Sequence, residues 1–154
     1  MPETNAAMPP VNAEGTAVAI SDNRGFRTAL QVGGHSLVAD EPIAVGGTDA
    51  GPSPYGLISA ALASCTAMTL HLYAKQKQLP VTAIRVAVTH AKVHERDEED
   101  CENNDAAKID RLERTLWIEG DLPDTARQRL LQIAERCPVH RTLQGNVRIV
   151  TRAG

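Results

Sequence analysis

The chain has 154 residues and a mass of 16.5 kDa, the size of one ordinary domain, which excludes most large multi-domain enzymes. Hydrophobic residues make up 42% and charged residues 23% of the chain, close to the globular average, so we expect a folded core. The formal net charge is −3 and only 3% of residues are aromatic. These values disfavour nucleic-acid binding through a basic face or a base-stacking surface.

Residues 1–15 have neither a basic start nor an apolar stretch, and we expect a flexible N-terminal tail rather than a signal peptide. Residues 16–154 then form a single domain. Residues 50–74 carry no charge, but two prolines and several Ser and Thr residues interrupt them, which predicts a buried core helix and no membrane partner. The expected compartment is the cytoplasm, where the three cysteines are thiols rather than structural disulfides.

The N-terminal third has the pattern of β-strands. Residues 16–20 are a short apolar run, and residues 26–32 alternate apolar and polar side chains beyond a turn-forming segment. The pair Gly33-Gly34 allows a second turn before a strand at residues 36–39. Residues 46–54 are too rich in Gly and Pro for regular structure. The pattern therefore predicts a hairpin and one further strand.

Ser53 and Pro54 predict the start of a long helix that runs to about Gln78. Serine caps free backbone N–H groups at a helix start, and proline is favoured at the first helical position. The apolar residues of this helix recur at spacings of three and four, which places them on one stripe. The stripe comprises Ile58, Leu62, Cys65, Met68 and Leu72. Because this helix carries so little charge, we expect it to be buried between two subunits as well as within one subunit.

After Pro80 we expect two strands, a helix, a helical turn and a last strand. Residues 81–93 alternate as a strand with one exposed face, and in its antiparallel neighbour Leu112, Leu116 and Ile118 alternate with polar residues up to Gly120. Pro123 starts a second helix whose inner face includes Cys137. Pro138 prevents its continuation, and a helical turn at residues 139–143 and a strand at residues 146–151 follow. The order predicts an α+β fold with a mainly antiparallel sheet.

An acidic segment lies between the two predicted strands. Residues 95–105 contain seven acids and one arginine, a local net charge of −6, which is typical of a solvated loop. Cys101 lies within it, and the surrounding carboxylates are expected to raise the pKa of its thiol. Cys101 is therefore predicted to be a poor nucleophile.

Cys65 and Cys137 lie 72 residues apart, on the inner stripes of helices that should pack on the same sheet. Two interpretations are open, a redox pair or two buried thiols that act as small apolar side chains. The spacing of Cys137 and His140 lacks the second ligand pair of a zinc site. The sequence also has no nucleotide-binding glycine loop, so we expect neither a metal nor a cofactor.

Three motifs resemble the OsmC/Ohr family, in a less characterised branch: GGTDAGPSPY at residues 46–55, SCTAMTL at residues 64–70 and RCPVH at residues 136–140. The resemblance extends from about Phe26 to Arg152. It implies an OsmC-like fold, an antiparallel sheet packed on a long central helix, in an intertwined homodimer.

The resemblance also implies a thiol-dependent peroxidase that serves in oxidative stress defence. Cys65 would attack the O–O bond of an organic hydroperoxide, and Cys137 would resolve the sulfenic acid as a disulfide. The apolar stripe around Cys65 favours organic peroxides over hydrogen peroxide. An external dithiol, either a lipoyl protein or a small thiol, would then reduce the disulfide.

The peroxidase branches carry an arginine on the N-terminal hairpin and a glutamate near the helix start, which together stabilise the thiolate. In this chain Arg27 is the expected cation, with Arg24 as an alternative. Tyr55 or Gly56 stands at the position of the glutamate, and the nearest carboxylate belongs to Asp49. The resemblance thus extends the predicted catalytic set to Cys65, Cys137, Arg27 and Asp49.

Three alternatives remain open at this point. His35 could serve as a base beside Cys65, or it could cap a turn or a strand end. The absent glutamate favours a non-catalytic or weakly active OsmC-like stress protein that binds an apolar small molecule. A third function is thiol chemistry on another electrophile, with no disulfide step.

Overall fold

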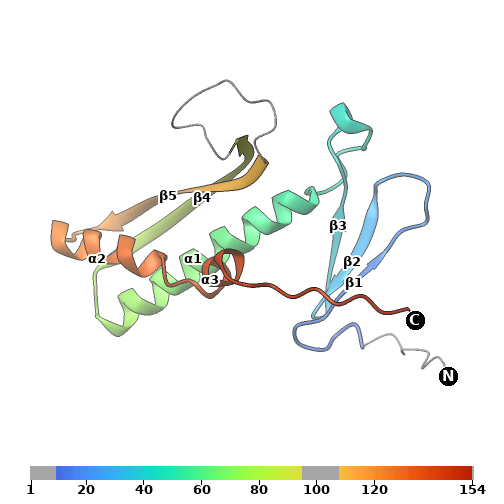
Figure 1. Cartoon of the computed structure of the whole chain (residues 1–154). Coiled ribbons are helices and arrows are strands. Elements are labelled where there is room, and N and C mark those ends of the chain that lie inside the picture. The colour runs from blue at the N-terminus through green and yellow to red at the C-terminus, as the bar shows by residue number, and fades with distance from the viewer. Residues whose placement is uncertain (1–9, 95–107, 154) are drawn as a thin grey trace. The chain divides into compact units, whose positions relative to one another are not determined.

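The computed structural model describes residues 10–94 and 108–153 and has an α+β architecture with two antiparallel sheets and a long helix (Figure 1). This confirms the predicted fold class. The chain divides into two compact units, Met1–Leu57 with Arg148–Gly154, and Ile58–Val147. The prediction of one domain after a tail at residues 1–15 stays a prediction. Residues 1–9, Cys101 and the acidic segment lie outside the described residues.

The first unit contains a three-stranded antiparallel sheet in the order β1-β2-β3 (Figure 1). Gly33 and Gly34 join β2 to β3 with φ values of 54° and 88°. Positive φ at both positions suits a two-residue hairpin turn and is accessible to glycine. The hairpin and the extra strand are therefore confirmed. The strands are β1 (Ala17–Ile20), β2 (Thr28–Val32) and β3 (His35–Ala39).

The loop after β3 folds back on itself, with a short 3₁₀ helix, η1 (Ile43–Val45), that the sequence pattern did not predict. Gly47 and Gly51 permit this close approach. A Cβ on Gly47 would lie 1.8 Å from the carbonyl oxygen of Glu41, and one on Gly51 would lie 2.0 Å from that of Val38. Two of the three glycines of the GGTDAGPSPY motif, Gly47 and Gly51, are thus required by backbone packing.

The long helix α1 (Pro54–Gln76) begins where the sequence predicts. The hydroxyl of Ser53 accepts a hydrogen bond from the backbone N–H of Gly56 at 3.1 Å, which caps the helix start. The helix ends two residues before the predicted Gln78, because Gln78 has a φ of 53°, outside the helical region. By length and composition α1 could cross a membrane, a test that core helices of soluble proteins also pass.

Within one chain, the buried face of α1 differs from the predicted stripe. Four residues at intervals of four are buried in the described chain, whereas Met68 is 70% and Leu72 is 56% exposed. Apolar and small residues surround this helix, so their spacing does not select one face. The buried residues are Leu62, Thr66, Leu70 and Ala74.

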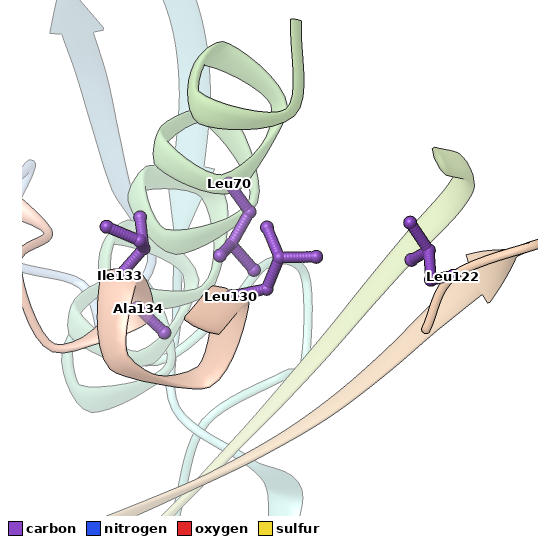
Figure 2. Packing of buried hydrophobic residues seen from close by; sticks show 5 residues of the cluster. All are labelled: Leu70, Leu122, Leu130, Ile133 and Ala134. Atoms are coloured by element: carbon purple, nitrogen blue, oxygen red, sulfur yellow. The ribbon is translucent and has the colours of Figure 1, made fainter. Parts of the chain in front are cut away.

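The second unit pairs a two-stranded sheet with helices. The antiparallel strands β4 (Val81–His94) and β5 (Lys108–Gly120) lie alongside α1 and α2 (Asp124–Ala134) (Figure 1). Leu70 of α1 and Leu130 of α2 are fully buried at the centre of the core (Figure 2). The other buried members of this cluster are Leu122, Ile133 and Ala134.

Two C-terminal predictions require correction. Cys137 does not lie on the second helix, because α2 ends at Ala134 and Cys137 directly precedes α3 (Pro138–Gln144). The expected strand at residues 146–151 is absent, and the segment has no partner strand in the described part of the chain. A strand requires hydrogen bonds to a neighbour, which apolar alternation alone does not supply. The predicted helical turn at residues 139–143 is confirmed as α3.

Candidate active site

The structure brings Cys65 and Cys137 together, although 72 residues separate them in sequence. Cys65 lies in the middle of α1 and is partly exposed, whereas Cys137 is fully buried. Both are free thiols, and their side chains are hydrogen-bonded to each other. Two sulfurs in contact can be converted to a disulfide with little movement of the backbone.

Proline places Cys137 at the break between two helices. A residue before proline is disfavoured in the helical region, and Cys137 is extended, with φ −55° and ψ 130°. Pro138 occupies the first position of α3, where its missing N–H is not needed. As a result, the Cys137 sulfur faces the backbone N–H groups of Val139 and His140.

The two thiols differ in acidity. Burial raises the pKa of Cys65, and its hydrogen bond to Cys137 raises that pKa further. Burial alone would raise the pKa of Cys137 as well, but hydrogen bonds from Cys65, the His140 N–H and the Thr66 hydroxyl lower it below its ordinary value. These contacts favour the charged form of Cys137 more than that of Cys65.

A network of polar side chains lies beside the pair. The Nη1 group of Arg114 on β5 donates to the Thr66 hydroxyl at 2.9 Å, and its Nη2 group lies 2.9 Å from Oε1 of Glu135. The other carboxylate oxygen of Glu135 lies 3.4 Å from Nε2 of His140. The Arg114 side chain is only 9% exposed. The network links α1, β5, the end of α2 and α3 around the two sulfurs.

Sequence reasoning missed Arg114. Along β5 the half-buried positions alternate with exposed ones, and Arg114 occupies an inward position between Leu112 and Leu116. A charged residue in the apolar register of a strand is the signal that could have found it, because an isolated charge is seldom buried without a partner.

Arg27 and Asp49 belong to the first unit, whereas both cysteines belong to the second. Arg27 is exposed just before β2. Asp49 lies in the loop after β3 with a φ of 56°, and its backbone N–H donates to the carbonyl oxygen of Glu41 at 3.1 Å. Their predicted roles at the thiolate stay predictions.

The alternative residues also lie in the first unit. The Nε group of Arg24 is 3.7 Å from the carboxylate of Asp22 in an exposed ion pair. His35 is exposed at the start of β3. The contact of either residue with Cys65 stays a prediction. Within residues 10–94 and 108–153, no group of three or more His, Cys, Asp or Glu side chains is placed to hold a metal ion.

Comparison with known proteins identifies relatives of this chain. The sequence model of the family described as OsmC-like protein matches residues 47–152, a range that includes both cysteines. No curated protein sequence matches the chain significantly.

Several solved structures share the fold. The OsmC-like protein of Mycoplasma pneumoniae has a TM-score of 0.64 at 22% identity, with 84% of this chain and 85% of that chain covered. An organic hydroperoxide resistance protein, OsmC, of Legionella pneumophila has a TM-score of 0.62 at 19% identity, over 86% and 90% of the two chains. The organic hydroperoxide resistance protein OhrB of Bacillus subtilis has a TM-score of 0.59 at 20% identity, over 86% and 91%.

Proposed function

The chain belongs to the OsmC-like protein family, and from this premise we propose that it is a thiol-dependent peroxidase that reduces organic hydroperoxides in oxidative stress defence. Cys65 is the attacking thiol and Cys137 the resolving thiol. The names of the structures from Legionella pneumophila and Bacillus subtilis, both organic hydroperoxide resistance proteins, support this class of substrate.

One observation carries the proposal, the contact between the side chains of Cys65 and Cys137. Two thiols that folding brings into contact are what a disulfide step requires, and this supports the proposal. Cys65 is the partly exposed member, and so a peroxide reaches its sulfur more readily than that of buried Cys137. This difference in exposure supports the assignment of the two roles.

The reaction proceeds in three steps. The Cys65 sulfur attacks one peroxide oxygen, the O–O bond breaks, and the alkoxide leaves and is protonated to an alcohol. The Cys137 sulfur then attacks the sulfur of the Cys65 sulfenic acid, which forms the disulfide and releases water. Finally, an external dithiol, a lipoyl protein or a small thiol, reduces the disulfide in the cytoplasm. Arg27 and Asp49 are the further catalytic residues of this proposal, with Arg27 as the cation that supports the Cys65 thiolate.

The test is to count thiols after one equivalent of cumene hydroperoxide is added to the reduced protein. We expect the loss of two thiols and of two mass units in Cys101→Ser protein, which serves as the control because its pair is intact. Cys65→Ser should not react. Cys137→Ser should stop at a sulfenic acid that dimedone traps. Slow background oxidation in every variant, with no dependence on Cys65, would contradict the proposal.

A second function is favoured by one observation, an open and mostly apolar pocket of about 390 Å³ beside α1. In this alternative the protein is a non-catalytic or weakly active OsmC-like stress protein that binds an apolar small molecule. Binding of a fluorescent apolar probe that Ala83→Glu abolishes, together with unreactive thiols, would favour this alternative. The pocket residues are Ala67, Met68, His71, Val81, Thr82, Ala83 and Ile84.

A further inference from the structure

Arg114 connects the two segments of chain that carry the cysteines. Its Nη1 group donates to the Thr66 hydroxyl at 2.9 Å, and Thr66 directly follows Cys65 in α1. Its Nη2 group donates to Glu135 at 2.9 Å, and Glu135 lies two residues before Cys137. We propose that Arg114 is a positioning residue, which through these two contacts, the arginine clamp, holds Cys65 and Cys137 at the separation that disulfide formation needs. The inference rests on the proposed function, because it concerns the disulfide step of the same reaction.

The guanidinium group of Arg114 suits this task because it is planar and rigid. Nη1 and Nη2 have fixed positions within one group, so two partners that are bound at once are also fixed relative to each other. The Arg114 side chain is only 9% exposed and Thr66 is fully buried, so little water competes for the hydrogen bond between them. The contacts with Thr66 and Glu135 cross 48 and 21 residues of chain. They therefore restrain segments that the local backbone does not hold together.

At the α1 end of the arginine clamp, the helix transmits the restraint to Cys65. The Thr66 hydroxyl donates to the carbonyl oxygen of Leu62 at 2.7 Å, which fixes the Thr66 side chain on the helix. Cys65 and Thr66 are consecutive residues in the middle of α1, so they move together. A displacement of Thr66 relative to β5 therefore displaces the Cys65 sulfur as well.

At the other end, backbone hydrogen bonds transmit the restraint from Glu135 to Cys137. The N–H of Cys137 donates to the carbonyl oxygen of Ala134 at 3.3 Å, and the N–H of Arg136 donates to that of Ile133 at 2.9 Å. These bonds hold the short connection between α2 and α3 against the end of α2. Glu135 therefore cannot move away from β5 without displacing Cys137.

The position of the two sulfurs affects both the rate and the equilibrium of the disulfide step. The Cys137 sulfur must meet the sulfur of the Cys65 sulfenic acid, and a small misplacement of reacting atoms slows such an attack strongly. A disulfide also tolerates only a narrow range of geometry, so a restraint that keeps the sulfurs in contact favours the disulfide over the dithiol. The equilibrium between these two forms therefore measures the arginine clamp without any peroxide.

The experiment equilibrates full-length Cys101→Ser protein with mixtures of glutathione disulfide and glutathione under nitrogen. The pair gives its two hydrogens to glutathione disulfide, which becomes two glutathione molecules, and the Cys65–Cys137 bond appears as a loss of two mass units. We expect Arg114→Met to shift this equilibrium about tenfold towards the dithiol. Arg114→Lys should shift it by a similar amount, since lysine keeps the charge without the two-pronged contact. Full recovery in Arg114→Lys would show that the charge alone acts, and would overturn the inference.

A second variant keeps the inference testable where Arg114→Met does not fold. Glu135→Ala removes one end of the arginine clamp at a side chain that is 63% exposed, and it should shift the equilibrium in the same direction. The matched control is another arginine–glutamate pair of β5, in which Nη2 of Arg111 lies 3.1 Å from the Glu113 carboxylate and both side chains are exposed. Arg111→Met and Glu113→Ala should leave the equilibrium unchanged.

The equilibrium separates a positioning role from a purely structural one. In a purely structural role, Arg114→Met would lower the free energy of unfolding but leave the equilibrium of the folded protein unchanged, which would overturn the inference. An equal shift in Arg111→Met, or a Cys65–Cys137 pair that forms no disulfide, would also overturn it.

The inference and the proposed function can fail separately. An equilibrium that depends on Arg114 in a protein that consumes no cumene hydroperoxide would refute the function alone. An equilibrium that does not depend on Arg114, in a protein that still loses two thiols to the peroxide, would refute the arginine clamp alone.

Discussion

The carboxylate of Asp40 organises the loop that carries the GGTDAGPSPY motif. Asp40 is 2% exposed, and its two oxygens accept hydrogen bonds from the Thr48 hydroxyl and from the backbone N–H groups of Glu41, Thr48 and Ala50. These bonds, led by that of Thr48, lower the pKa of Asp40 from 3.8 to about 2. Each donor stabilises the charged form, so the loop depends on an ionised carboxylate.

The stability that Asp40 contributes should depend on pH. Because the pKa is lower in the folded chain than in the unfolded chain, the contribution is fully present above 3.8 and is lost as the pH falls towards about 2. We expect Asp40→Asn to lower the free energy of unfolding at pH 6 and to have little further effect near pH 2, measured by urea denaturation. A difference that stays constant with pH would contradict this. Asp22→Asn, at an exposed carboxylate, is the control.

Among the elements, the break between α2 and α3 decides where the Cys137 sulfur lies. Pro138 keeps Cys137 extended, and that conformation turns the sulfur towards Cys65 and the N–H groups of α3. In Pro138→Ala this restriction is removed and residue 137 can enter the helical region. The position of the proposed resolving cysteine thus depends on a proline next to it in sequence.

We expect Pro138→Ala to slow disulfide formation about tenfold or more, because a small displacement of a reacting atom is costly. Sulfenic acid on Cys65 should then accumulate, measured as the fraction trapped by dimedone in intact-mass spectra. Pro123→Ala, at the start of α2, is the matched control and should form the disulfide at the normal rate. Equal rates in both variants would show that Pro138 does not position Cys137.

Leu130 and Leu131 are adjacent in α2, but the packing of the core predicts different effects of their substitution on the free energy of unfolding. Leu130 is fully buried in the same cluster as Leu70 (Figure 2). Leu131 is 44% exposed. Leu130→Ala should reduce the free energy of unfolding by about 2–5 kcal/mol, through lost burial and the cavity that remains. Leu131→Ala should change it by about 0.5 kcal/mol or less. Urea denaturation followed by circular dichroism measures both, and similar losses would contradict the described packing.

Local signals made the start of the long helix predictable. Ser53 and Pro54 act on the backbone next to them, and the start of α1 follows directly from them. The expected strand at residues 146–151 depends on a distant partner that the local pattern cannot reveal. Arg114 was missed for the same reason, since the contact with Thr66 crosses 48 residues of chain. The contact of Cys65 with Cys137 was foreseen only as a possibility, because separation in sequence does not give distance in space.

At the scale of the whole molecule, apolar surface remains exposed in the single chain. Met68 and Leu72 on α1 are 70% and 56% exposed, and Ile149 near the C-terminus is 86% exposed. Exposed apolar residues on a helix whose one charged residue is Lys75, in its last turn, are typical of an interface between subunits. The segment around Ile149 has no strand partner in the described part of the chain. Both features support the predicted homodimer, in which a second copy would cover them.

A charge on this helix face should therefore dissociate the dimer. In Met68→Glu an unpaired carboxylate would be buried twice in a symmetric interface, and we expect the dissociation constant to rise by about 100-fold or more. Sedimentation equilibrium of the two proteins measures this constant directly. Gln128→Glu adds the same charge at an exposed position of α2 and should leave the dimer intact. A monomeric wild-type protein would contradict the predicted homodimer, and a dimeric Met68→Glu protein would place the interface on another face.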